Sequence, residues 1–87
     1  MRVIHKYAID VNSDNIIELP EQEDYEILTV AVENEELAIW VEKPVFCNYS
    51  QKTKFIARRA GNEFKEDNAA YIGSAFKNNR LWHVYKL

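Results

Sequence analysis

The chain has 87 residues, a formal net charge of −3 and a single cysteine. This length predicts one domain over residues 1–87, and a hydrophobic content of 47% excludes a disordered protein. One cysteine excludes an internal disulfide, and two widely separated histidines offer no metal-ligand spacing, so we expect no metal site and no cofactor. The sequence shows no secretory leader and no apolar run long enough to span a membrane, which predicts a cytoplasmic protein without a membrane partner.

Charge is unevenly divided along the chain. Residues 1–42 hold two basic residues against eleven acidic ones, whereas residues 43–87 hold nine basic residues against three acidic ones. One interpretation is that acidic and basic strands are neighbours and pair across a sheet. The other is that the folded surface has an acidic side and a basic side, each suited to a partner of opposite sign.

Alternating side chains predict strands in the first half of the chain. The segments 1–10 and 16–19 are separated by a cluster of turn-forming Asn, Ser and Asp. The strongest signal is 25–42, where two runs of period two are interrupted at Asn34-Glu35, a pattern typical of a β-hairpin. Because both sides of the first run, 27–32, are mostly apolar, we expect this strand to be central and covered on two sides.

Residues 43–53 are predicted to be the longest irregular stretch, since Pro44 ends the preceding strand and Asn48 favours a turn. A strand is expected over 54–60, and Gly61-Asn62 indicates a turn or bulge after it. The aromatic side chains of the irregular stretch either contribute to function or cover an open end of the sheet.

The last two strands are predicted over 70–76 and 80–87, joined at Asn78-Asn79. Two asparagines suit a type I′ turn, because asparagine adopts the left-handed conformation more readily than most residues other than glycine. Gly73 lies inside a strand and indicates a bend or a close approach of the backbone. With about six or seven strands, little or no helix and short connections, the chain is predicted to form an all-β fold, a small antiparallel β-sandwich or a partly open barrel.

The sequence offers little support for catalysis. His5 and His83 lie in predicted strands beside aromatic residues, as expected of half-buried structural histidines, and Cys47 has no local partner for a Cys-His nucleophile. A phosphate-binding glycine loop, a zinc-protease histidine pair and a nucleophile elbow are all absent from the sequence. We therefore predict a protein that is not an enzyme.

Binding of a small anionic ligand fits the sequence better. Basic residues cluster over 52–59 close to aromatic side chains; arginine can hold phosphate, and an aromatic ring can stack a base. This combination suits a nucleotide or a short single strand, whereas the acidic pI of about 5.3 argues against long nucleic acid. The predicted ligand-binding residues are Arg58, Arg59, Lys54, Tyr49, Tyr71 and Trp82.

A protein-binding surface on the acidic half is the alternative. Its carboxylates could mimic a phosphate backbone or occupy the basic groove of a nucleic-acid-binding protein. The same carboxylates could instead form a solvated face that keeps a small sheet protein soluble. The residues of this alternative are Glu21, Glu23, Asp24, Glu33, Glu35 and Glu36.

Self-association into a homo-oligomer is also predicted. Eleven aromatic residues are more than one small core hides easily, and sheet edges are open to pairing. The C-terminal strand, with Trp82 and Tyr85 on opposite faces, is the expected contact. An oligomer would also deepen a ligand pocket, because one small sheet offers little concavity.

Five short segments carry a resemblance to known proteins. They are HKYAIDV (5–11), IIELP (16–20), ILTVAVENEELAIW (27–40), YIGSAF (71–76) and LWHVYK (81–86). In order and spacing they are similar to a family of small phage and prophage proteins of uncharacterised function. Members of that family often carry a Gly-x-Gly-His-Pro-like turn after an arginine-containing strand. This chain has Arg59-Ala60-Gly61-Asn62-Glu63 there, so no role of that histidine carries over.

The resemblance implies a phage or prophage origin and no particular activity. Small phage proteins without catalytic motifs commonly bind a component of the host, so counter-defence in the cytoplasm of an infected bacterium is the expected context. The leading hypothesis is sequestration of a nucleotide immune signal. The alternatives are an inhibitor that binds a host defence or nucleic-acid-binding protein through its acidic residues, and a structural or accessory phage protein.

Overall fold

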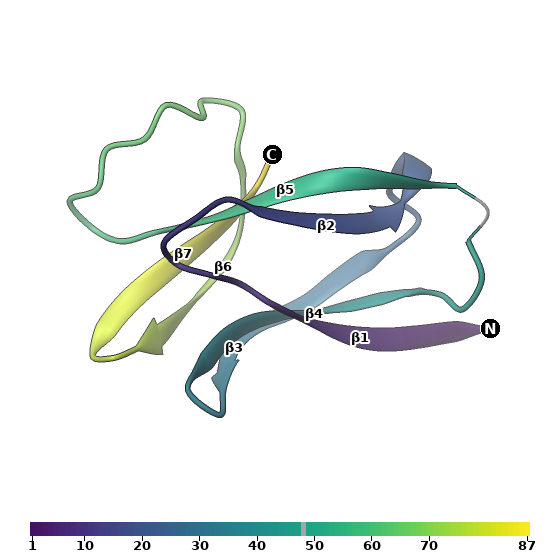
Figure 1. Ribbon diagram of the computed structural model, residues 1–87, viewed down its shortest axis with the longest axis horizontal. Coiled ribbons are helices and arrows are strands. Elements are labelled where there is room, and N and C mark those ends of the chain that lie inside the picture. Colours follow the sequence, from purple (N-terminus) through teal and green to yellow (C-terminus); the bar gives the residue numbers. More distant parts are fainter. Residues whose placement is uncertain (48) are drawn as a thin grey trace.

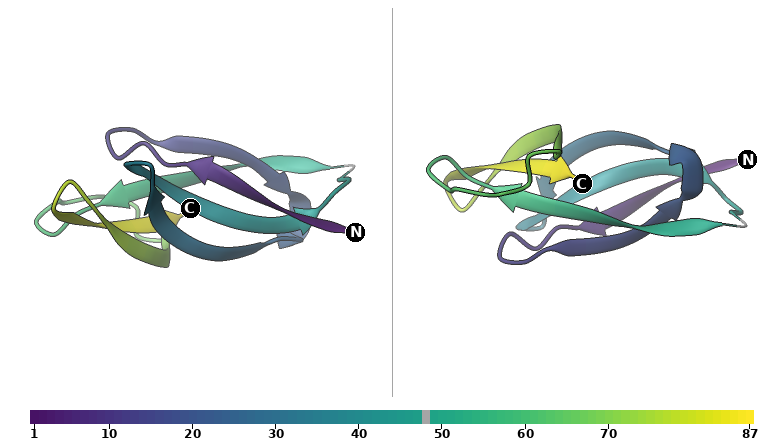
Figure 2. Two further views of the ribbon diagram at one scale, coloured as in Figure 1. Left: turned by 90° about the horizontal axis from the view of Figure 1, so that it is seen from below. Right: turned by 90° about the horizontal axis from the view of Figure 1, so that it is seen from above.

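Two antiparallel sheets packed face to face form the computed structural model, which describes residues 1–47 and 49–87 (Figures 1 and 2). One sheet has the order β1-β4-β3, with β1 (Arg2–Ala8), β4 (Glu36–Pro44) and β3 (Glu26–Glu33). The other has the order β2-β5-β7-β6, with β2 (Asn15–Pro20), β5 (Ser50–Arg58), β7 (Arg80–Lys86) and β6 (Ala70–Lys77). A single 3₁₀ turn, η1 (Glu21–Glu23), leads from β2 towards β3.

The predicted all-β sandwich is thus confirmed, and the two sheets stay separate rather than closing into a barrel over the described residues. The turn expected at Asn48 lies outside the described residues. In the described part of the chain, no helix is both long and apolar enough to cross a membrane.

Both predicted hairpin turns are present. Asn34 and Glu35 have φ angles of 52° and 64°, and Asn78 and Asn79 have φ angles of 54° and 63°. Positive φ at both central positions is typical of the type I′ turn, whose twist matches that of the flanking strands. These turns set the register of the β3–β4 and β6–β7 ladders.

Glu35→Gly is expected to raise the free energy of unfolding by about 0.5–1 kcal/mol, since a β-carbon in the left-handed region is penalised and the flexibility of glycine in the unfolded chain offsets only part of the gain. The shift of the urea unfolding midpoint measures this. Glu33→Gly, in the adjoining strand, is the matched control and should lower stability. A destabilised Glu35→Gly protein would contradict the type I′ assignment.

The core lies between the two sheets. Leu37, Ile39 and Val41 alternate along β4 and are fully buried, as are Phe55 of β5 and Val84 of β7. Side chains of a strand alternate between its two faces, so this spacing places one set of residues from each sheet in the shared interior.

The strand predicted to be central is an edge strand. β4 pairs with both β1 and β3, whereas β3 is at the edge of its sheet. The register shifts between Ile27 and Thr29, and Leu28, the residue at this shift, is 44% exposed. The bulge changes the phase of the alternation, so Ile27 packs against the core together with Val30 and Val32. The bulge therefore explains why successive residues of β3 are apolar although the strand is not buried on both of its faces.

Gly73 marks a close approach, as predicted. A β-carbon at this position would lie 3.0 Å from Val30 Cγ2, and the β6–β7 ladder shifts register between Tyr71 and Gly73. The glycine therefore lets the free edges of the two sheets, β3 and β6, pack together.

The prediction of an irregular stretch over 43–53 is wrong. β4 extends to Pro44 and β5 begins at Ser50, because pairing with β2 recruits residues 50–53 into the sheet. The longest irregular segment is 59–69, which leaves the end of β5 and returns to β6 (Figure 1).

Segment 59–69 packs against the outer face of the β2-β5-β7-β6 sheet. The ring of Phe64 lies 5.3 Å from that of Tyr85. Ile56 alternates with the core residues of β5 and so points to this outer face, yet it is fully buried. A small second apolar layer therefore forms outside the sheet.

The C-terminal strand, β7, was the predicted oligomer contact, but it cannot pair with a second copy through its backbone edge. β7 lies between β5 and β6, so its backbone has a partner on each side over residues 83–86. Trp82 packs against the core, and Tyr85 is partly covered by Phe64. The open edges of the two sheets belong to other strands.

Candidate functional site

A basic hollow lies at the end of the sandwich where β5 leaves its sheet. Its volume is about 660 Å³, within the range of small-ligand pockets. The β1–β2 turn, the segment after β5 and the β6–β7 turn meet at this end, away from the N-terminus (Figure 1). The charged residues that line this basic hollow are Arg58, Arg59, Lys77, Arg80 and Glu63, and Trp82 forms part of its wall.

The register of the sheet explains why this end is open. β5 pairs with β7 only as far as Arg58↔His83, whereas β7 continues to Arg80 beside β6. Beyond Arg58 the chain turns: the Asn62 N–H donates to the Arg59 carbonyl at 3.1 Å, and the Arg59 N–H donates to Asn62 Oδ1 at 3.0 Å. Gly61 allows the turn with a φ of 90°. The turn indicated by Gly61-Asn62 is confirmed, and it places Arg59 beside the start of β7.

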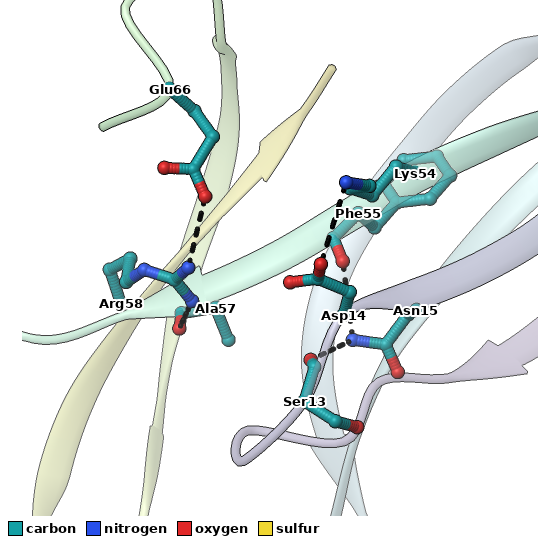
Figure 3. A network of polar contacts seen from close by, with 8 residues as sticks. All are labelled: Ser13, Asp14, Asn15, Lys54, Phe55, Ala57, Arg58 and Glu66. Atoms are coloured by element: carbon teal, nitrogen blue, oxygen red, sulfur yellow. Dashed lines mark hydrogen bonds and ion pairs between the residues drawn. The ribbon is translucent and has the colours of Figure 1, made fainter. Parts of the chain in front are cut away.

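Arg58 is already neutralised by a neighbouring carboxylate. Its Nη2 donates to Glu66 Oε1 at 3.2 Å, and its Nη1 donates to the Ala57 carbonyl at 3.0 Å (Figure 3). The guanidinium also lies 5.7 Å from the centre of the Phe64 ring. Arg58 therefore anchors segment 59–69 to the sheet, and its charge is largely satisfied within the protein.

The other three cations of the basic hollow have no such partner in the described part of the chain. Among the residues that the structure describes, no carboxylate oxygen lies within 4.0 Å of the cationic nitrogens of Arg59, Lys77 or Arg80. Glu63 is the one carboxylate among residues 1–47 and 49–87 that lines the hollow beside them. The site therefore carries a local excess of positive charge.

Three of the six predicted ligand-binding residues come together in the basic hollow, namely Arg58, Arg59 and Trp82. Lys54 instead pairs with Asp14 at 3.4 Å (Figure 3). Tyr71 packs against the rings of His83 and Tyr85. Tyr49 is 71% exposed at the opposite end of β5, roughly 25–30 Å away along a strand of this length. None of these three residues lines the hollow.

A family model matches residues 1–87 and is described as a domain of unknown function, DUF7352. The chain belongs to this family. No curated protein and no solved structure matches it. The membership of an uncharacterised family that the sequence suggested is confirmed, while a phage origin stays a prediction.

Lys77 and Arg80 of the DUF7352 chain were not among the predicted site residues. They flank the Asn78-Asn79 turn and face each other as the last pair of the β6–β7 ladder. A two-residue turn brings its flanking residues together, so two neighbouring charges could have been inferred from sequence. Their position beside Arg59 and Trp82 depends on which loops share one end of the sandwich, and no local pattern reports that.

The acidic residues of the alternative site form two separate groups. Glu21, Glu23 and Asp24 lie in and just after η1, and Glu33, Glu35 and Glu36 lie at the β3–β4 turn, so the two groups stand at opposite ends of β3. Four of them take part in ion pairs, which are Glu23–Lys86 (2.9 Å), Asp24–Arg2 (3.4 Å), Glu33–Lys6 (3.1 Å) and Glu36–Lys6 (3.6 Å). The Glu23–Lys86 pair joins the acidic half of the chain, 1–42, to the basic half, 43–87, as the Asp14–Lys54 pair also does. The other three pairs lie within residues 1–42, so these contacts support pairing between the two halves only in part.

Two lysines in these ion pairs have raised pKa values. The hydrogen bond to Glu33 raises the pKa of Lys6 and outweighs desolvation. Burial lowers the pKa of Lys86, but its contacts with Tyr25 and Glu23 outweigh that effect and raise it. Both lysines therefore stay charged through the neutral range.

Proposed function

We propose that this DUF7352 protein binds a small anionic ligand, a nucleotide, in the basic hollow without chemically altering it. The observation that carries the proposal is the convergence of Arg59, Lys77 and Arg80, which have no carboxylate partner within ion-pair distance in the described chain, around the aromatic wall of Trp82.

The side chains suit the two parts of a nucleotide. Arg59 and Arg80 each present a planar fork that can donate two hydrogen bonds to phosphate oxygens, and Lys77 adds a third positive charge. The indole of Trp82 offers a surface on which a base can stack, and its packing against the core holds it in place before a ligand binds.

Polar groups for recognition complete the site. Asn12, Asn62 and Asn78 line the hollow, and each amide can both donate and accept hydrogen bonds with a base edge or a sugar hydroxyl. The described residues that line the hollow include no histidine, cysteine or serine. The groups that remain suit binding contacts, and we expect capture of the ligand without its conversion.

Counter-defence is the biological context that we attach to this proposal. The chain resembles phage proteins, and a nucleotide-binding protein without catalytic groups could lower the level of a nucleotide immune signal in the cytoplasm of an infected bacterium. The inhibitor that acts through acidic residues has weaker support, because those residues form two separate groups and four of them are already paired.

Fluorescence of Trp82 tests the proposal. Trp40 is the other tryptophan, and it lies on the outer face of the β1-β4-β3 sheet with the Lys6 ammonium 5.8 Å from its ring centre. In the Trp40→Phe protein, Trp82 is the only tryptophan. With excitation at a wavelength that selects tryptophan over tyrosine, we expect saturable quenching by nucleotides that weakens as salt is added. Trp82→Phe, which keeps Trp40, should show little quenching.

Native mass spectrometry of the unmodified protein with the same nucleotides provides a second readout, and it also reports the oligomeric state. A bound nucleotide mass would support the proposal. A panel of mono- and dinucleotides that neither quenches Trp82 nor adds mass would overturn it.

A further inference from the structure

A second hollow lies directly beside the basic hollow. Its volume is about 440 Å³, and it is lined by the turn over 59–62 together with Arg80, Leu81 and His83 of β7. We call it the outer hollow. The two hollows share Arg59, Asn62 and Arg80, so these three residues stand between them.

Alternation along β7 explains why the two hollows have different walls. Trp82 packs against the core and lines the basic hollow, so its neighbours Leu81 and His83 point to the other face of the sheet and line the outer hollow. Consecutive residues of one strand thus present an indole on one side, and an imidazole with an aliphatic chain on the other. Arg80, at the start of the strand, reaches both.

We infer that the ligand is a dinucleotide whose phosphate lies between Arg59 and Arg80, with one base in each hollow. This inference rests on the proposed function and adds the class of nucleotide. Tryptophan and histidine rings and guanidinium planes are all surfaces on which bases stack in single-stranded recognition. A mononucleotide would occupy one hollow and leave the second stacking surface unused.

The charge distribution agrees with this arrangement. No acidic residue of the described chain lines the outer hollow, and its two arginines are the ones shared with the basic hollow. Two of the three cations without a carboxylate partner in the described chain, Arg59 and Arg80, therefore lie between the two base surfaces, where the phosphate of two linked nucleosides would be, and Lys77 lies on the side of the basic hollow. Linear and cyclic dinucleotides share this chemistry, and the experiment separates them.

Calorimetric titration of the unmodified chain with AMP, linear pApA and cyclic di-AMP, and with the matching guanine series, tests the inference. We expect at least one dinucleotide to bind about tenfold or more tightly than the corresponding mononucleotide, because a second stacked base contributes to binding. A preference for the linear or for the cyclic compound shows which of the two kinds of dinucleotide the site binds.

Leu81→Ser should reduce that preference, since it removes the aliphatic wall of the outer hollow. Phe76→Ser is the matched control: Phe76 is the cross-strand partner of Leu81, is 69% exposed and lines neither hollow, so its loss should leave the preference unchanged. Unchanged thermal midpoints would establish that both variants fold.

Equal affinity for mono- and dinucleotides would overturn the dinucleotide inference and leave the proposed function standing. An equal loss of preference in Leu81→Ser and Phe76→Ser would overturn the placement of the second base. Absence of binding by every nucleotide would overturn the proposed function and this inference together.

Discussion

Arg59→Glu combined with Arg80→Glu is expected to weaken nucleotide binding by at least about 100-fold, because each arginine contact with phosphate contributes about 1.5–3 kcal/mol and each new carboxylate repels the ligand. The fold should tolerate the change. Arg80 is exposed, and the turn at Arg59 is held by backbone and Asn62 hydrogen bonds that do not involve the arginine side chain. Titration of the variant with the best nucleotide of the panel measures the effect.

A second variant, in which the charges of two other basic residues are reversed, controls for net charge. Lys52→Glu with Lys65→Glu changes the net charge by the same amount at two exposed positions outside the basic hollow. Its affinity should stay within about twofold of the unmodified protein at physiological salt, where charges farther apart than roughly 8 Å are largely screened. If both double variants lost affinity equally, the long-range charge of the protein would explain binding, and the basic hollow would not be the site.

Phe55→Ala is expected to lower the free energy of unfolding by about 3–5 kcal/mol, the usual loss when a large aromatic ring is removed from a packed core. Phe55 is fully buried and lies in β5, the strand that pairs with both β2 and β7. A domain of this size has only about 5–10 kcal/mol in total, so the variant should be largely unfolded at moderate urea concentrations. Equilibrium unfolding followed by circular dichroism measures the loss.

Phe46→Ala is the matched control, because it makes the same substitution at a ring that is 90% exposed. We expect its stability to stay within about 0.5 kcal/mol of the unmodified protein. A small loss in Phe55→Ala would contradict a single core shared by the two sheets, and a large loss in Phe46→Ala would show that this loop ring is buried in solution.

Local chemistry determined most of the secondary structure. The alternation of side chains identified the hairpin over 25–42, and Asn78-Asn79 identified the second tight turn, because left-handed backbone conformations are a property of the turn residues themselves. Gly73 likewise predicted a close contact, because a glycine inside a strand usually marks a bend or a place where another segment approaches the backbone closely. These features depend on residues close in sequence and were predicted correctly.

The order of the strands was decided by packing. The apolar run over 27–32 predicts a doubly covered strand, but the bulge at Leu28 changes its phase and β3 lies at an edge of the sheet, with β4 in the centre. A bulge forms where the twist of a strand and its pairing partner require one, and single-sequence periodicity does not report the partner.

The candidate site was decided almost entirely by tertiary structure. Arg58, Arg59 and Trp82 were predicted, but Lys77 and Arg80 joined them only because the end of β5 and the β6–β7 turn lie at the same end of the sandwich. Lys54 and Arg58 were equally good phosphate ligands by sequence, yet Asp14 and Glu66 already pair with them. A sequence shows which residues carry charge. Which of those charges remain available to a ligand depends on where distant segments place the opposite charges, and that is a property of the folded chain.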